Sequence, residues 1–272
     1  HELAKKIENL MVLTCDVSTS AGLDRYRKSY PDKYLDLGIA EQNMIGVAAG
    51  LASENYNVIT TTFAPFQTMR CCEQIKVNLG YMKQKVTMVG IASGLVLGTL
   101  GYTHCCIEDI GVLRSIPNLT IISPADSLET VKALEELMNY DHPAYLRITG
   151  SSNNPIVYKK DYDFKIGKSI SIKEGKDITI FCTGSMVYQT LEASKLLEKE
   201  SISVKVVNIH TIKPIDKEAI LDSCKSKLVV TVEEHNIIGG LGSAVSEIIS
   251  TVKNSPKQLF LGLKDTYSKG GN

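Results

Sequence analysis

The 272-residue sequence predicts an α/β protein of two consecutive domains, each a mainly parallel sheet flanked by helices. Short apolar runs rich in β-branched residues predict buried strands. Longer segments with apolar residues at helical spacing separate these runs, and this alternation is typical of parallel sheets. The alternation stops at a polar stretch and then starts again, which indicates a second domain.

The first half of the chain carries the alternation clearly. Strands are predicted at residues 10–13, 58–63, 86–91 and 119–122, and helices at residues 43–53 and 128–140. Asp126 or Ser127 can cap the second of these helices. Glu129 is predicted to lie on its polar side, and Val131 recurs with the apolar residues that pack on the sheet. This domain is predicted to span residues 1–150.

A polar connection follows the first domain. Gly150-Ser-Ser-Asn-Asn-Pro155 and the charged, tyrosine-containing stretch after it predict a linker over residues 151–165. Beyond it, strands are predicted at residues 178–182, 204–208 and 228–232, and helices at 186–201, 217–224 and 242–252. A smaller second domain is therefore predicted over residues 166–272, ending in the loop Lys269-Gly-Gly-Asn272.

The composition excludes several classes of partner. Lys+Arg and Asp+Glu each total 30, so no charge excess favours a nucleic acid backbone or an acidic membrane surface. The sequence has no apolar run of the roughly 20 residues that a membrane helix needs, and no signal-peptide pattern at its start. The seven cysteines include two adjacent pairs, which fits neither a disulfide framework nor a zinc site. We therefore expect a protein of the reducing cytoplasm without a metal site of its own.

Glu41 is the first candidate functional residue. The run Asp36-Leu-Gly-Ile-Ala-Glu41 is predicted to end a strand and to turn into a helix rich in Gly and Ala. Because Gly46 and Gly50 leave almost no side-chain bulk, something is expected to pack very close to this helix. A carboxylate at a helix N-terminus stabilises the helix dipole by about 0.3–1 kcal/mol, so Glu41 also fits the role of a simple cap.

Several ordered motifs give the chain a resemblance to a known family. Gly38-Ile-Ala-Glu-Gln-Asn43 and its small-residue helix resemble the signature of the transketolase family's pyrimidine-binding domain. The segments Thr62-Phe-Ala-Pro-Phe66, Gly101-Tyr-Thr-His-Cys-Cys-Ile-Glu-Asp109, Leu113-Arg-Ser-Ile-Pro-Asn-Leu119 and Ser123-Pro-Ala-Asp126 resemble its later motifs, and residues 232–245 are similar to its C-terminal domain signature. The resemblance covers nearly the whole chain and implies a pyrimidine-binding domain followed by a transketolase C-terminal domain.

The resemblance implies roles in binding and activating thiamine diphosphate. Glu41 would hydrogen-bond the ring nitrogen of the cofactor's aminopyrimidine, which needs a carboxyl group partly protonated near neutral pH, as burial would favour. Phe63 and Phe66, which could otherwise be ordinary core residues, correspond to the aromatics that flank and stack on that ring. Met69, at the next position of this spacing, is a candidate contact.

The resemblance also assigns His104 and Asp16. His104 would face cofactor and substrate as a second catalytic residue, although a histidine near glycines is often a buried one bonded to a carbonyl. Asp16 matches an acidic position near the cofactor, although an Asp in such a loop often forms only an Asx-turn. Gly239-Gly-Leu-Gly242 and His235 are expected to be architectural, since a glycine-rich turn alone is weak evidence for a phosphate cradle.

A companion subunit follows from what the chain lacks. The family holds the cofactor diphosphate and its metal ion with a Gly-Asp-Gly run ending in Asn, and this sequence contains no such run. We therefore expect a split transketolase, in which a partner carries the diphosphate domain and holds Mg²⁺ or Ca²⁺. The expected assembly is α2β2, with self-association through the pyrimidine-binding and C-terminal domains.

The expected substrate pocket departs from the family pattern. Residues 90–101 lack the histidine and the acidic pair expected there, and have Ala92, Thr99 and Leu100 instead. Arg147 is retained, but Gly150 stands where an arginine for the sugar phosphate is expected. These differences favour two-carbon ketol transfer from a ketose donor to an aldehyde or related sugar acceptor, in which the acceptor or donor is not an ordinary pentose phosphate or an unusual residue supplies the phosphate contact.

Three alternatives remain at this point. The β subunit of 2-oxo acid dehydrogenases and deoxyxylulose phosphate synthase share the Gly-Ile-Ala-Glu-Gln motif, although the Thr-His loop and the C-terminal signature favour transketolase. A non-catalytic scaffold subunit would also explain the altered substrate pocket. Glu41 and the two phenylalanines argue against the scaffold.

Overall fold

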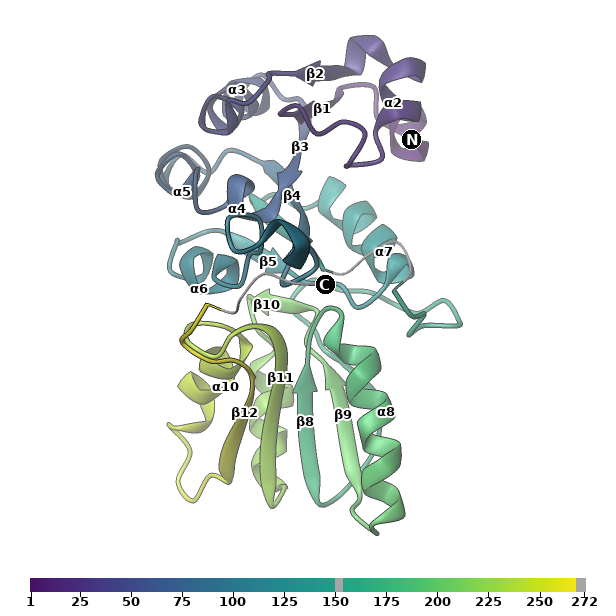
Figure 1. The fold of residues 1–272 in the computed structure, drawn as a ribbon, viewed down its shortest axis with the longest axis vertical. Helices are drawn as coiled ribbons and strands as arrows, with labels where there is room; N and C mark the ends of the chain where they lie inside the picture. The colour runs from purple at the N-terminus through teal and green to yellow at the C-terminus, as the bar shows by residue number, and fades with distance from the viewer. Residues whose placement is uncertain (150–153, 268–272) are drawn as a thin grey trace.

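The computed structural model describes residues 1–149 and 154–267 and has two α/β domains, one above the other in Figure 1. Two sheets, each mostly parallel and flanked by helices, confirm the predicted fold class. Gly150, the start of the predicted linker and the terminal loop Lys269-Gly-Gly-Asn272 lie outside the described residues. No helix among the described residues is both long enough and apolar enough to cross a membrane.

The first sheet has the strand order β10-β5-β6-β4-β3-β1-β2. Its strands are β1 (Leu10–Thr14), β2 (Tyr34–Asp36), β3 (Asn57–Phe63), β4 (Val86–Ser93), β5 (Thr120–Ile122), β6 (Ala144–Thr149) and β10 (Thr211–Lys213). All of these pair in parallel except β10, which runs antiparallel to β5. Since β10 belongs to the second half of the chain, the two halves share this sheet.

Helices cover both faces of the first sheet. They are α1 (Glu2–Lys6), α2 (Asp24–Ser29), α3 (Glu41–Ser53), α4 (Ala64–Gln67), α5 (Cys72–Gln74), α6 (Asp109–Arg114) and α7 (Ser127–Met138), with short helices η1 (Pro31–Lys33), η2 (Ile75–Tyr81) and η3 (Gly98–Leu100). Adjacent strand residues alternate between the faces, as Leu13 packs in the cluster with α3 and α6 and Val12 in the cluster with α2 and α7. The parallel strands are therefore buried on both sides.

The helix α7 has one of the two predicted caps but differs from its prediction at Glu129 and Val131. Asp126 is the N-cap, and its side chain accepts a hydrogen bond from the backbone N–H of Glu129 at 2.9 Å. Glu129 itself is fully buried rather than on the polar side, because its carboxyl accepts bonds from Ala125 N–H, the Tyr162 hydroxyl and Asn208. Val131, predicted to pack on the sheet, is 55% exposed. Periodicity alone could not reveal the polar partners that bury Glu129.

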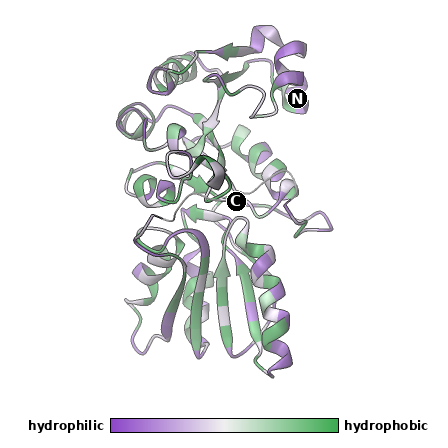
Figure 2. Cartoon of the chain, in the orientation of Figure 1, coloured by the Kyte–Doolittle hydropathy of each residue, from purple (hydrophilic) through white to green (hydrophobic). Residues whose placement is uncertain are grey.

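The second sheet has the order β12-β11-β8-β9-β7. It contains β7 (Ile170–Lys173), β8 (Ile178–Cys182), β9 (Val204–Asn208), β11 (Leu228–Asn236) and β12 (Lys257–Leu263), with helices α8 (Met186–Lys199), α9 (Lys217–Asp222) and α10 (Leu241–Ile249) and the short helix η4 (Ser223–Lys225). Figure 2 shows largely hydrophobic strands beside an α8 with hydrophilic and hydrophobic residues. Only β7 pairs antiparallel, at the edge beside β9.

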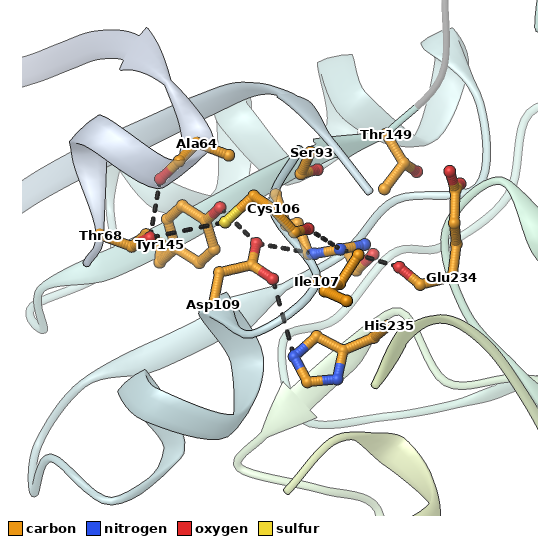
Figure 3. A network of polar contacts seen from close by, with 12 residues as sticks. Ala64, Thr68, Ser93, Cys106, Ile107, Asp109, Tyr145, Thr149, Glu234 and His235 are labelled. Atoms are coloured by element: carbon orange, nitrogen blue, oxygen red, sulfur yellow. Dashed lines mark hydrogen bonds and ion pairs between the residues drawn. The ribbon is translucent and has the colours of Figure 1, made fainter. Parts of the chain in front are cut away.

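A buried polar network joins the two domains (Figure 3). Arg147, 1% exposed, donates from Nε to Asp109 Oδ2 at 2.8 Å, and the Tyr145 hydroxyl donates to the same oxygen at 2.7 Å. Arg147 Nη2 also donates to the backbone oxygens of Cys106 at 3.2 Å and Glu234 at 3.0 Å. Arg147 is therefore a structural residue between β6 and β11, and it is not available to bind a substrate phosphate.

Replacing Arg147 with Met should lower the free energy of unfolding by about 3–5 kcal/mol, because Asp109 would stay buried without its charge partner. Urea denaturation followed by circular dichroism measures this loss. The control Arg27→Met breaks an exposed pair with Asp24 and should cost less than about 1 kcal/mol. An equally small loss for Arg147→Met would contradict the assignment, and the double variant Arg147→Met/Asp109→Leu should recover part of the loss.

His210 lies at the junction beside β10 and is fully buried. Its ring stacks on Phe164 with centroids 4.3 Å apart, and Nδ1 is 2.9 Å from the Thr211 hydroxyl. Burial lowers the pKa of His210 to about 4, so the folded chain keeps this ring neutral.

This pKa makes folding sensitive to acid. The unfolded chain protonates His210 below about pH 6.5, so the free energy of unfolding should fall by about 3 kcal/mol between pH 6.5 and pH 4 because of this residue. Urea titrations across this range should show a smaller acid-dependent loss in His210→Asn. The variant His142→Asn, which changes an exposed histidine, should keep the wild-type slope. Identical slopes in His210→Asn and the wild type would contradict the prediction.

Candidate active site

Glu41 begins α3 at the carboxyl end of the first sheet and is 3% exposed. The turn before it is held by Asp36, whose Oδ1 accepts the backbone N–H groups of Asp16 at 2.9 Å and Gly38 at 3.0 Å. Gly38 has φ +68°, a conformation that favours glycine. The motif therefore buries a carboxylate at the point where strand β2 turns into α3.

Arg70 is the residue that Glu41 contacts directly. Its Nη1 lies 2.6 Å from Glu41 Oε2, and its guanidinium lies over the ring of Phe66 at 4.0 Å from the centroid. Within the described chain no hydrogen bond reaches the other Glu41 oxygen, Oε1. Arg70 thus fixes one carboxylate oxygen and leaves the second open to a ligand.

Sequence reasoning named the neighbouring Met69 and missed Arg70. The sequence offered one clue, since Arg70 directly follows Met69 in the three-residue spacing that begins at Phe63. Only the folded chain brings Arg70 to Glu41. Met69 is 47% exposed, and Asp16 is an exposed residue with φ +55°. No hydrogen bond or ring contact joins either side chain to Glu41 or to the nearby rings in the described part of the chain. Their predicted cofactor contacts stay predictions.

Phe63, Phe66 and His104 form one ring cluster. The Phe63 and Phe66 centroids are 6.2 Å apart, and the His104 ring lies 6.2 Å from Phe63 and 5.4 Å from Phe66. His104 is partly exposed, and its Nδ1 is 2.9 Å from the Thr103 hydroxyl. Through Phe66 and Arg70 this cluster is continuous with Glu41, so the structure brings together four of the six predicted site residues.

The loop that carries His104 is anchored at its base. Gly94 and Cys106 exchange two backbone hydrogen bonds of 2.8 and 2.9 Å, which close the loop into a hairpin. Glu234 of β11 accepts the backbone N–H of Leu95 at 2.9 Å and also bonds the Ser185 hydroxyl. The second domain therefore positions the loop of the first.

The glycine-rich segment of the second domain is structural, as expected. A Cβ on Gly240 would collide with Glu233, and one on Gly242 would collide with Phe260. Glu233 accepts the backbone N–H groups of Leu241 and Gly242 at the start of α10, and burial raises its pKa to about 7. His235 is also fully buried, where Nε2 meets the backbone N–H of Gly111 at 3.3 Å.

The small-residue face of α3 differs from its expectation. A Cβ added to Gly46 or to Gly50 would meet nothing within 4 Å. Among residues 1–149 and 154–267, the close packing predicted for this helix is therefore found at Ala48 and Ala49, which are buried in the core, and not at Gly46 or Gly50.

Comparison with known proteins places this geometry in a family. The model of "Transketolase, pyrimidine binding domain" matches residues 1–154, and that of "Transketolase, C-terminal domain" matches residues 167–271. The chain belongs to the transketolase family. Members of this family are generally thiamine-diphosphate-dependent transferases.

Several relatives are similar to most of the chain. A "putative transketolase C-terminal section" of Methanocaldococcus jannaschii is 39% identical over 99% of this chain and 85% of the relative. The "6-deoxy-6-sulfo-D-fructose transketolase subunit SqwH" of a Clostridium species is 36% identical, over 99% of this chain and 84% of that protein. A solved "split gene transketolase, inactive beta4 tetramer" has a TM-score of 0.88 at 36% identity, covering 97% of this chain and 86% of the other.

The Glu41–Arg70 pair should couple the two residues energetically. A double-mutant cycle with Glu41→Gln and Arg70→Met should give an interaction energy of about 1–2 kcal/mol, less than a fully buried pair because Arg70 is 39% exposed. Urea denaturation of the wild type and the three variants measures it. The exposed pair Glu192–Lys195 should give less than about 0.5 kcal/mol in a matching cycle. Equal values for the two cycles would contradict the proposed fixing of Glu41.

Proposed function

We propose that this chain is the subunit of a thiamine-diphosphate-dependent split transketolase that carries the pyrimidine-binding and C-terminal domains. The observation that carries the proposal is Glu41, buried at the start of α3 with one oxygen open, beside the rings of Phe66, Phe63 and His104. The reaction would move a two-carbon ketol unit from a ketose donor to an aldehyde or a related sugar acceptor.

The residues present fit the cofactor's aminopyrimidine, which is flat and has hydrogen-bonding edges. Glu41 Oε1 would accept or donate the bond to its ring nitrogen, while Arg70 keeps the carboxyl group in place through Oε2. Phe66 and Phe63 would pack against the ring and exclude water. The bound cofactor supplies a carbon that can lose its proton and attack a carbonyl group.

His104 has the position of a second catalytic group in this proposal. Its ring contacts both phenylalanines and remains partly exposed, so it can meet a substrate above them. The hairpin bonds at Gly94 and Cys106 hold its loop in place. We propose that His104 orients the substrate oxygen atoms by hydrogen bonding.

A companion subunit is the second part of the proposal. The sequence has no Gly-Asp-Gly run for the cofactor diphosphate, and relatives that cover most of the chain are named as subunits or sections of transketolases. No cluster of three His, Cys, Asp or Glu side chains that could hold a metal lies within the described residues. We propose that the partner holds the diphosphate with Mg²⁺ or Ca²⁺, in an α2β2 assembly.

The proposed acceptor is not an ordinary pentose phosphate. Arg147, the arginine retained near the expected phosphate site, is buried and already bonded to Asp109 and to the Glu234 carbonyl. Relatives carry names with different substrates, among them 6-deoxy-6-sulfo-D-fructose and apulose 4-phosphate. A scaffold subunit is the competing proposal, and it predicts that Glu41 is dispensable for cofactor chemistry.

The decisive experiment follows proton exchange at C2 of thiamine diphosphate in the complex with the companion subunit. Glu41→Gln should slow this exchange by about 10²-fold or more, the usual effect of removing a catalytic proton-transfer group. Native mass spectrometry should find the complex intact. The control Glu54→Gln changes an exposed carboxylate just after the other end of α3 and should exchange at the wild-type rate. Unchanged exchange in Glu41→Gln would favour the scaffold.

A further inference from the structure

A cavity of about 720 Å³ opens at the carboxyl ends of β3, β4 and β6, next to the first turns of α7. Phe63 forms part of its wall and also belongs to the ring cluster with Phe66 and His104. One side chain therefore borders both the proposed cofactor site and this cavity. The volume is in the usual range for a small-molecule site.

The wall of the cavity is uncharged over most of its area. Its residues are Ser20, Phe63, Ile91, Ala92, Val96, Leu97, Pro124, Ala125, Asp126, Ser127, Thr130, Val131, Ile148, Thr149 and Asn154. They include no lysine, arginine or histidine. The wall combines aliphatic side chains from β4, β6 and α7 with hydroxyl groups, which suits a ligand that has both apolar and hydroxylated parts.

The one feature of this wall that could attract an anion is already used by the protein. A helix N-terminus attracts negative charge, and α7 begins at the cavity. Asp126 caps that end, and its Oδ2 accepts the backbone N–H groups of Val157 at 2.9 Å and Tyr158 at 2.8 Å. Glu129 is buried behind it. The Asp126 carboxyl group at this end of the cavity opposes a phosphate.

The lysine of α7, Lys132, does not neutralise the Asp126 carboxyl group. Lys132 forms an ion pair with Asp161, and its Nζ lies 5.2 Å from the centroid of the Tyr162 ring. Asp161 and Tyr162 lie a few residues after Asn154, the last lining residue in the sequence. Lys132 itself does not line the cavity.

We propose that this cavity receives the part of the acceptor sugar farthest from its aldehyde, and that this part is uncharged and partly deoxygenated. The inference rests on the proposed transketolase function and names its substrate class. The hydroxyl groups of Ser127, Thr130 and Thr149 bind the remaining sugar hydroxyls. Thr130 already donates to the Asp126 carbonyl and so accepts from the sugar, whereas Thr149 already accepts the Ser185 N–H and so donates to it. Ile91, Val96 and Ile148 cover the deoxygenated carbon, where a phosphorylated sugar would bury its charge without a cation.

The test compares acceptors that differ only at C5: D-ribose 5-phosphate, D-ribose and 5-deoxy-D-ribose. The complex with the companion subunit is supplied with hydroxypyruvate, whose C1–C2 bond breaks to release CO₂. The remaining two-carbon unit then bonds through C2 to the acceptor aldehyde carbon, and the aldehyde oxygen takes up one proton from water to become a hydroxyl group. We expect kcat/KM for 5-deoxy-D-ribose to exceed that for D-ribose 5-phosphate by about tenfold or more, the cost of one unmet charge-assisted bond. A tenfold preference for the phosphate would overturn the inference.

A charge introduced at the rim gives a second, independent readout. Val131 is 55% exposed, so Val131→Arg should fold and should raise kcat/KM for D-ribose 5-phosphate about tenfold. Val131→Gln changes the same position without adding charge and should give no such gain. Leu196→Arg, an exposed aliphatic residue on α8, should leave every acceptor unchanged. A gain in all three variants, or in none, would overturn the placement.

Binding is measured separately so that failure of the proposed function is distinguishable. Saturation-transfer NMR should detect contact between the methyl group of 5-deoxy-D-ribose and the complex, and Thr130→Phe should remove the signal by filling the cavity. If C2 exchange depends on Glu41 but the methyl signal is missing, the transketolase function stands and this inference falls. If the methyl signal is present and exchange is independent of Glu41, the proposed function falls and the cavity assignment stands.

Discussion

The buried ion pair between Asp109 and Arg147 joins segments that are far apart in the sequence. Asp109 begins α6, Arg147 lies on β6, and the second domain supplies the Glu234 carbonyl from β11. Burial lowers the pKa of His235 at this junction, and its ring packs beside the pair with Nε2 3.8 Å from Asp109 Oδ1. Removing water from two charges is costly, and the extra bonds from Tyr145 and to the Cys106 carbonyl offset that cost.

The positions of both proposed binding regions depend on this junction. Cys106, bonded to Arg147, is also the base of the hairpin that carries His104. Glu234 uses its backbone oxygen for Arg147 and its side chain for Leu95 in the same hairpin. The second domain therefore fixes the loop that carries His104.

The two proposed regions have opposite chemistry. The Glu41 region pairs a buried carboxylate with an arginine and three aromatic rings, which suits a flat, polar heterocycle. The cavity beyond Phe63 has aliphatic walls, hydroxyl groups and the carboxyl group of Asp126, whose two oxygens accept backbone N–H groups. Phe63 belongs to both, since its ring is part of the cluster with Phe66 and also lines the cavity.

Sequence patterns were sufficient to predict the fold class, the family resemblance and four residues that meet in space: Glu41, Phe63, Phe66 and His104. Strand and helix periodicity and local motifs carry that information, because they depend on near neighbours along the chain. Three further findings required the folded chain: Arg70 pairs with Glu41, Arg147 forms its hydrogen bonds between the domains, and Glu129 is buried. These outcomes depend on charged side chains whose partners lie 29, 38 and 79 residues away, distances over which no local pattern fixes a contact.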